Sequence, residues 1–95
     1  MVSNRPPLPP FEFDARKSRI NKLKHGIYFI EAQALWMDDD LDQIAARHPR
    51  EQRSLMIGRI GGKHWTAVVT RRGDRVRLIS VRRSRAKEVE RYERR

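Results

Sequence analysis

The side chains best suited to proton-transfer chemistry in this chain are its three histidines, His25, His48 and His64. Histidine is the usual proton carrier near neutral pH. His25 follows Lys24 at the expected end of a helix, where it is a candidate acid or base. A histidine at that position can equally serve only to stabilise the helix dipole. His48 falls in an expected turn and His64 begins an expected strand, so both carry less functional weight.

Arginines on expected strands form the second group. Arg77 is predicted inside a strand and on one face with Ile79 and Val81, where a further apolar residue would be usual. A buried unpaired charge is costly, so we expect Arg77 to line a groove. The alternative is a salt bridge to an acidic residue across the sheet. The other arginines at strand ends are Arg59, Arg82 and Arg83.

These residue types fit metal-independent cleavage of RNA. In that reaction the 2′-OH is the nucleophile, and the protein supplies a base, an acid for the leaving 5′-oxygen, and cations for the phosphate. Arginine suits the last task because its planar fork grips phosphate with two hydrogen bonds. No histidine pair has zinc-site spacing. The run Asp38–Asp40 lacks the spaced oxygens of a hard-cation loop, and we interpret it as the end of a helix.

The distribution of charge points to an anionic partner. The chain has a formal net charge of +10; residues 1–46 hold 6 basic and 7 acidic groups, and residues 47–95 hold 16 basic and 5 acidic groups, giving −1 and +11. Fourteen of the 16 bases in the second half are arginine. Such a field concentrates a polyanion, although a basic surface can also serve solubility alone.

Length and composition bound the remaining possibilities. A chain of 95 residues is long enough for one domain and too short for two independent hydrophobic cores. It has no cysteine, which excludes disulfides and thiolate zinc sites. No apolar stretch approaches the roughly 20 residues that span a bilayer, and the first residues lack the apolar block of a signal peptide. We therefore expect a cytoplasmic protein.

The first half predicts an arm, a short strand and two helices. Residues 1–10 hold four of the five prolines and are expected to form an extended arm, with a single domain over residues 11–95. Residues 11–13 alternate like an edge strand. A helix is predicted over residues 15–25, with Asp14 as N-cap, Gly26 as its end, and Ile20 and Leu23 as its apolar stripe. A second helix is predicted from residue 27 to residue 37.

The second half predicts a sheet and a final helix. Strands are expected over residues 41–47, 52–60, 63–70 and 75–82, with a hairpin at Gly61–Gly62 and a turn at residues 71–74. In the last strand, Val76, Leu78 and Ser80 are expected to share one face. A helix over residues 85–94 would have Ser84 as N-cap. The fold class is α+β, with an antiparallel sheet of three to four strands, two N-terminal helices and a C-terminal helix, all on one sheet face.

Several segments, taken in their order and spacing, resemble BrnT-type toxins. They are Phe11-Glu12-Phe13-Asp14, Lys17, Asn21, Lys24-His25-Gly26, Ile57-Gly58-Arg59, the run from Arg77 to Arg83, and Glu88, Arg91 and Tyr92. The resemblance runs from about residue 11 to the end. The sequence departs from the family pattern at Val81, Ser84 and Tyr28, none of which removes a charged group.

The resemblance implies a RelE-like fold and a metal-independent endoribonuclease toxin, without cofactor, that arrests translation. It also implies a cognate BrnA-like antitoxin, which carries a DNA-binding segment and through which the complex binds its operator. We expect Arg77 and Arg82 on the phosphate, Arg59 in support, and Lys24 or His25 in proton transfer. The further RNA-binding candidates are Arg83, Lys17 and Tyr92; Tyr92 is equally expected as a core residue.

Two other functions remain open from the sequence. One is a nucleic-acid-binding module without catalysis, and the other is a protein whose basic face only binds an acidic peptide. Binding modules usually interleave aromatics that stack on bases. Only Trp65 lies among the strands of the basic half, which favours contact with phosphates over base stacking.

Overall fold

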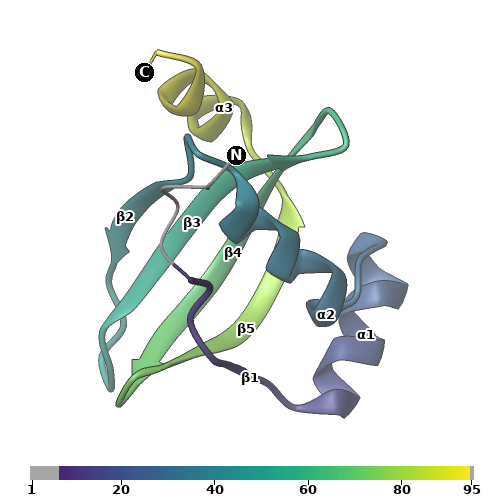
Figure 1. The fold of residues 1–95 in the computed structure, drawn as a ribbon, viewed down its shortest axis with the longest axis vertical. Helices are drawn as coiled ribbons and strands as arrows, with labels where there is room; N and C mark the ends of the chain where they lie inside the picture. Colours follow the sequence, from purple (N-terminus) through teal and green to yellow (C-terminus); the bar gives the residue numbers. More distant parts are fainter. Residues whose placement is uncertain (1–6, 95) are drawn as a thin grey trace.

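The computed structural model describes residues 7–94 and shows an α+β fold with one five-stranded sheet (Figure 1). The strands are β1 (Phe11–Glu12), β2 (Asp42–Ala46), β3 (Arg53–Ile60), β4 (Lys63–Arg72) and β5 (Arg75–Arg83). The helices are α1 (Ala15–His25), α2 (Phe29–Ala32), the 3₁₀ helix η1 (Gln33–Met37) and α3 (Ala86–Glu93). Within the described residues, no helix is long and apolar enough to cross a membrane.

The sheet has the strand order β1-β5-β4-β3-β2. Strands β2 to β5 form an antiparallel meander, as predicted, and the hairpin at Gly61–Gly62 is confirmed. The expected count of three to four strands is wrong, because the short edge strand at Phe11 joins the same sheet. It pairs with β5 in the parallel direction, which places Glu12 beside Arg77.

One face of the sheet, the core face, is covered by α2 and η1 (Figure 1). These helices contribute the buried side chains of Phe29, Ala32 and Leu35 to the core. Gly58 allows close packing here, because a Cβ on it would lie 3.0 Å from the side chains of Leu35 and Leu41, which would have to shift. The sheet contributes Met56, Trp65, Ala67, Val69, Val76, Leu78 and Val81.

The opposite face, the open face, holds the register row Asp42, Ile57, Thr66 and Arg82. Helix α3 lies across one end of this face, since Arg91 bonds to Asp42 and Glu88 to Thr66. Ile57 is fully buried on this side. The prediction that all helices cover one face is therefore wrong.

A β-bulge interrupts the alternation of β5. Val68 pairs with Ser80 and Val69 pairs with Leu78, so Ile79 has no register partner on β4. The predicted grouping of faces is wrong beyond this point, since the extra residue reverses the alternation. Ser80 joins Arg77 and Arg82 on the open face, while Val81 joins Leu78 in the core.

Helix α1 has the predicted ends but not the predicted buried face. The Asp14 carboxylate accepts from the N–H groups of Arg16 and Lys17, and Gly26 ends the helix at φ +85°. Ile20 and Leu23 are 43% and 88% exposed, which contradicts the predicted stripe. The buried residues of α1 are Ser18 and Asn21.

Asn21 explains this orientation, because its amide takes the place of a strand at the free edge of β5. Its Nδ2 donates to the carbonyls of Ile27 and Val81, both at 2.9 Å, and its Oδ1 accepts from the Val81 N–H at 3.1 Å. Ser18 accepts from the N–H of Phe29 at 2.9 Å. Polar bonds rather than an apolar stripe therefore hold α1 against β5.

Three further boundaries differ from the predictions. The second helix begins at Phe29, not residue 27, and continues as the 3₁₀ segment η1. Helix α3 begins at residue 86, and Ser84 bonds to Thr66 instead of capping the helix.

The expected proline arm is described only over residues 7–10, which have no regular structure; residues 1–6 lie outside the described part. The Pro10 carbonyl accepts from Val76 at 2.9 Å.

Candidate active site

A hollow of about 160 Å³ lies between α1 and β5. Three candidates from the sequence, Lys17, Lys24 and His25, line it together with Ile79 and Ser80 of the bulge. All three side chains belong to exposed residues on one helix. The spacing of α1 therefore brings its cations to the place where β5 is bulged, and we call this the α1–β5 hollow.

Arg77 lies on the open face of β5, before the bulge. Its Nη1 donates to the Glu12 carboxylate at 3.0 Å, so the salt bridge foreseen as the alternative is present. Arg77 keeps 25% of its side chain exposed, and its other N–H groups make no bond within residues 7–94. The pKa of Asp14 is lowered by the N–H groups of Lys17 and Arg16, and the charges of Lys17 and Arg77 add to the effect.

Arg82 lies on the same face, beyond the bulge, and is held by Glu88. Nη1 and Nη2 donate to the two Glu88 oxygens at 2.8 and 2.9 Å, and Nη1 also donates to the Arg83 carbonyl. Thr66, fully buried on β4, donates to Glu88 at 3.0 Å. A guanidinium has five N–H donors, so these three bonds leave two for another anion.

The electrostatics of this pair are strong. The bonds from Arg82 hold the pKa of Glu88 at about 2, although burial of the carboxylate opposes the shift. Glu88 raises the pKa of Arg82 in turn. Glu88 also accepts from the Arg85 N–H at 2.8 Å, at the start of α3. The ionised Glu88 thus ties together α3, β4 and β5.

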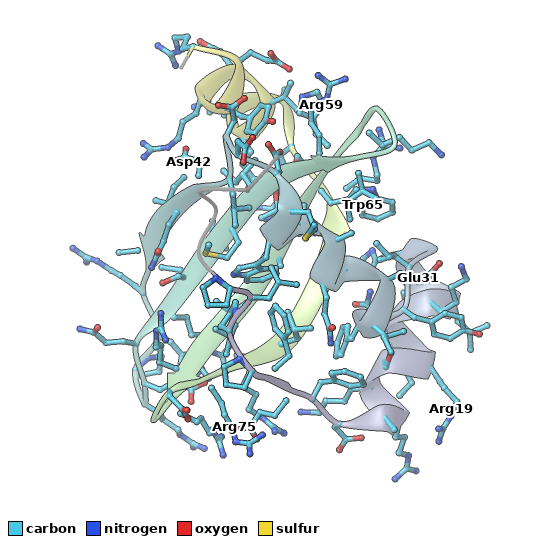
Figure 2. All side chains as sticks on the ribbon, viewed as in Figure 1. Arg19, Glu31, Asp42, Arg59, Trp65 and Arg75 are labelled. Carbon is cyan, nitrogen blue, oxygen red and sulfur yellow. The ribbon has the colours of Figure 1, made fainter. Side chains whose placement is uncertain are left out.

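A second group of candidates lies at the α3 end of the sheet. The Tyr92 hydroxyl donates to Asp38 at 2.7 Å, and the same oxygen accepts from the Arg59 N–H at 2.8 Å. The Arg59 side chain is exposed there (Figure 2), beside the acidic run Asp38–Asp40. Tyr92 is 7% exposed, so the core interpretation of Tyr92 is the one that its burial supports.

Burial raises the pKa of Tyr92 to about 12, and the bond to Asp38 adds to the shift. Burial acts on Asp38 as well, but the bonds from Tyr92 and from the N–H groups of Asp40 and Arg59 outweigh it, and its pKa is lowered. The Asp38 carboxylate thereby anchors α3 to the β3 end. The sequence interpretation of residues 38–40 as a simple helix stop missed this role.

The structure does not bring every candidate together. Arg83 lies on the core-face side, over the Trp65 ring at 5.5 Å, and so faces away from Arg82. Arg59 and Tyr92 lie at the α3 end and do not line the α1–β5 hollow. Four candidates or bulge residues, Lys17, Lys24, His25 and Ser80, line the hollow, and Arg77 and Arg82 lie on the same face of β5 as Ser80.

Sequence reasoning allowed an acidic partner for Arg77 but identified neither Glu12 nor the role of Glu88. Glu12 orients Arg77 and Glu88 orients Arg82, while Thr66 bonds to Glu88. At the α3 end, the His64–Glu93 pair lies at 2.6 Å near Tyr92. Thr66 and Thr70 gave one usable signal, because two polar residues four apart on a central strand mark one face as polar. Across residues 7–94, no group of three His, Cys, Asp or Glu side chains is placed to hold a metal.

A family model with the description "Ribonuclease toxin, BrnT, of type II toxin-antitoxin system" matches residues 13–88. The match spans 76 of 95 residues, counted from 13 to 88, and holds α1, the bulge and Glu88. The chain belongs to the BrnT family. The resemblance found in the sequence is therefore confirmed. No curated protein matches the chain.

Membership defines the general activity of this BrnT-family chain. It is a ribonuclease toxin of a type II toxin–antitoxin system, so its substrate is RNA and its partner is an antitoxin. The matched range contains Arg77, Arg82 and the three α1 candidates that line the α1–β5 hollow, whereas Glu12 and Tyr92 lie outside it. The residues that the geometry gathers are thus nearly all within the family's shared region.

Proposed function

We propose that this BrnT-family chain cleaves RNA along the open face of β5, between the α1–β5 hollow and Arg82, without a metal ion. The supporting observation is the bulge at Ile79, which puts Arg77, Ser80 and Arg82 on one face next to the cations of α1. A phosphodiester lying over Ser80 would have a guanidinium on either side along the strand. This arrangement stabilises the additional charge of a phosphorane-like transition state.

The reaction needs no group beyond the chain's own side chains. A base removes the proton of the 2′-OH, the 2′-oxygen attacks the adjacent phosphorus, and the bond from phosphorus to the 5′-oxygen breaks. An acid gives the leaving 5′-oxygen a proton, and the products are a 2′,3′-cyclic phosphate and a 5′-hydroxyl. His25 and Lys24 line the hollow and are the proposed proton carriers.

Arg77 and Arg82 are the proposed phosphate ligands. Each is oriented by a carboxylate, Glu12 or Glu88, and each keeps N–H donors that its partner does not use. Lys17 is proposed to bind the backbone beside Arg77, while Arg59 and Arg83 would contact more distant phosphates. The lining of the hollow is cationic and carries no carboxylate. A divalent cation would be repelled there, which supports metal independence.

Wider features of the system belong to the same proposal. We infer that RNA cleavage arrests translation in the cytoplasm and that a BrnA-like, DNA-binding antitoxin neutralises the toxin and carries the complex to its operator. The fold is proposed to be RelE-like, with residues 11–95 as one domain and residues 1–10 as an arm. The order of two N-terminal helices, antiparallel meander and C-terminal helix supports this relationship.

Expression in a bacterial host under a tightly repressed promoter tests the function. Wild type is expected to stop growth and protein synthesis and to fragment RNA, and the Arg77→Ala/Arg82→Ala variant is expected to do neither. Arg16→Ala/Arg19→Ala, which removes two exposed cations of α1 outside the hollow, is the matched control. Harmless wild type with intact RNA would rule out the toxin function. RNA binding without cleavage would favour the nucleic-acid-binding module.

A further inference from the structure

We propose that the end of the sheet opposite α3 is a second RNA-backbone-binding surface, which extends the substrate track beyond the cleavage site. It consists of the β2–β3 connection, residues 47–53, and the β4–β5 turn, residues 71–75; we call it the arginine tip. The inference rests on the proposed function only in taking RNA as the ligand. It concerns residues to which the cleavage reaction assigns no role.

Two connections that are distant in sequence meet at this end (Figure 1). The Thr70 hydroxyl donates to the Gln52 carbonyl at 2.8 Å, which links β4 to the β2–β3 connection. The hydrogen bond from Arg53 is the main cause that lowers the pKa of Glu51, and the charge of Arg72, on the β4–β5 turn, adds to the effect. The two segments therefore form one surface.

The arginine tip has a large excess of positive charge. Six arginines stand against the two carboxylates of Glu51 and Asp74, a formal balance of +4. Arg53 is used in an ion pair with Glu51 at 2.9 Å. The other five are exposed and have no ion pair within residues 7–94. These five are Arg47, Arg50, Arg71, Arg72 and Arg75.

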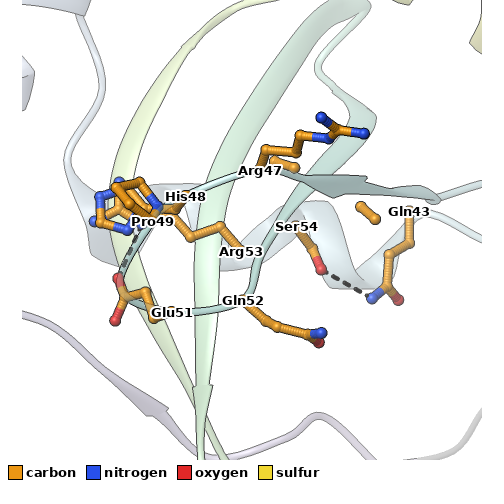
Figure 3. A pocket seen from close by; sticks show the side chains of 10 residues that line it. Gln43, Arg47, His48, Pro49, Glu51, Gln52, Arg53 and Ser54 are labelled. Carbon is orange, nitrogen blue, oxygen red and sulfur yellow. Dashed lines mark hydrogen bonds and ion pairs between the residues drawn. The ribbon is translucent and has the colours of Figure 1, made fainter.

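A broad hollow of about 990 Å³ opens at the β2–β3 connection (Figure 3). It is lined by Arg47, His48 and Arg53, and by Gln43, whose Nε2 donates to the Ser54 hydroxyl at 3.2 Å (Figure 3). The rest of its lining is polar or consists of Ala45, Ala46 and Pro49, so no large apolar side chain lines this hollow. A hollow of this volume can accept a hydrated, charged chain. The apolar side chains of Trp36, Met56, Val69 and Val76 line a separate hollow of about 430 Å³, which adjoins the first at Gln43, Gln52 and Ser54.

The chemistry of the arginine tip fits phosphates better than a protein partner. Protein interfaces are centred on buried aromatic or aliphatic anchors surrounded by polar residues. The large exposed apolar residues of the described chain are Leu8, Ile20, Leu23, Tyr28, Ile30 and Met37. None of them belongs to the arginine tip. A surface of arginines without apolar anchors is the pattern expected for a nucleic-acid backbone.

Arg77 connects the arginine tip to the proposed cleavage site. Arg53, Thr70 and Arg77 are register partners across β3, β4 and β5, so they lie in one row on the open face. Two positions before Arg77 on β5, and therefore on the same face, is Arg75, which belongs to the tip itself (Figure 2). An RNA strand bound at Arg77 can thus continue along β5 to Arg75 and onto the tip.

The test compares two variants with equal charge. The tip variant replaces Arg47, Arg50, Arg71, Arg72 and Arg75 by Gln, and the control replaces Arg16, Arg19, Arg85, Lys87 and Arg94 by Gln. The probe is a 2′-O-methyl RNA of about 20 nucleotides, which has no free 2′-OH and cannot be cleaved by the proposed route. A strand advances about 3.4 Å per nucleotide, so this probe exceeds the 37 Å long axis.

Fluorescence anisotropy at several salt concentrations gives the affinity. We expect the tip variant to bind at least about tenfold more weakly than the control, with a salt slope reduced by about 0.7 for each lost phosphate contact. Equal affinity and equal slope for the two variants would overturn the inference. So would a tip variant that binds RNA normally but no longer co-purifies with the co-expressed antitoxin, since the surface would then serve a protein.

Two further measurements keep the result interpretable. Replacing the five tip arginines by Lys keeps the charge that neutralises phosphates and should restore binding to within about threefold. If the five-fold Gln variant does not fold, two smaller variants, Arg47→Gln/Arg50→Gln and Arg71→Gln/Arg72→Gln/Arg75→Gln, are each compared with the control. Binding to this probe requires no catalysis. A wild type that binds the probe but cleaves no RNA would refute the proposed function and leave the inference standing.

Discussion

Arg77 and Arg82 lie on the same face of β5, although they are five positions apart. Their register partners on β4, Thr70 and Thr66, are four positions apart, and the bulge at Ile79 supplies the difference. In a regular strand an odd separation would place the two side chains on opposite faces. The bulge therefore makes possible a site in which both guanidinium groups face one phosphodiester backbone.

The first prediction separates Arg77 from its partner. Arg77→Ala is expected to lower the rate of RNA cleavage by about a hundredfold, because one transition-state donor is lost. Glu12→Gln keeps the arginine and removes only the charge of its partly buried partner, in a pair worth about 1 kcal/mol. Its rate should fall by no more than about fivefold. Equal losses for both variants in single-turnover cleavage would show that the pair acts only structurally.

The second prediction concerns Glu88 and acid. Its folded pKa of about 2 lies below the ordinary value of 4.5. A lowered carboxyl pKa stabilises the fold above pH 4.5 and loses that contribution as pH falls toward 2. Glu88→Gln should therefore be less stable at pH 7 by about 3 kcal/mol, in urea unfolding, and the two proteins should converge near pH 2.

Glu90→Gln provides the control for this measurement. This substitution removes the same charge from the same helix, but the Glu90 side chain is 65% exposed and pairs only with the exposed Arg94. Its stability should stay within about 0.5 kcal/mol of wild type. A Glu88 variant with wild-type stability across the whole range would contradict the role assigned to the Arg82–Glu88 pair.

The third prediction contrasts two residues of α1. Asn21→Ala leaves the N–H and C=O of Val81 and the C=O of Ile27 without their partner, and should cost about 2–4 kcal/mol. Leu23→Ala removes a side chain that is 88% exposed and should cost less than about 0.5 kcal/mol. Thermal unfolding of the two variants distinguishes the polar attachment of α1 from an apolar one, for which the order would be reversed.

The fourth prediction uses the hydroxyl of Tyr92. Its folded pKa of about 12 lies above the ordinary value of 10. A raised pKa contributes stability below pH 10, and this is lost as pH rises through 12. Tyr92→Phe should abolish the phenolate absorbance change near pH 12 and should lower stability at neutral pH by about 1 kcal/mol. Persistence of that change in the variant would assign it to another group.

Local sequence signals predicted much of the fold. Asp14 and Gly26 marked both ends of α1 because a side-chain cap and a left-handed glycine act within one turn. Gly61–Gly62 marked the β3–β4 hairpin for a similar reason. The family resemblance depended on such segments in order, and it is confirmed by the match over residues 13–88.

Features that depend on tertiary contacts were not predictable in the same way. No pattern within β5 announces that Ile79 is the extra residue; the pairing with β4 decides it. The apolar stripe expected from Ile20 and Leu23 was wrong, because Asn21 satisfies a strand edge sixty residues away. Helix α3 covers the opposite face because Glu88 bonds to Arg82 and Tyr92 bonds to Asp38. The site residues named from sequence stay predictions until cleavage is measured.

Cleavage by purified protein in excess EDTA tests the central proposal most directly. Wild type, Lys24→Gln/His25→Gln and Arg16→Gln/Arg19→Gln are compared on one RNA under single-turnover conditions, with unfolding curves to establish that all three are folded. We predict that wild type and the Arg16/Arg19 variant cleave alike, leaving 2′,3′-cyclic phosphate ends, and that the Lys24/His25 variant is slower by about a hundredfold or more. Undiminished cleavage by that variant, or no cleavage by wild type until Mg²⁺ is restored, would contradict the proposed site and mechanism.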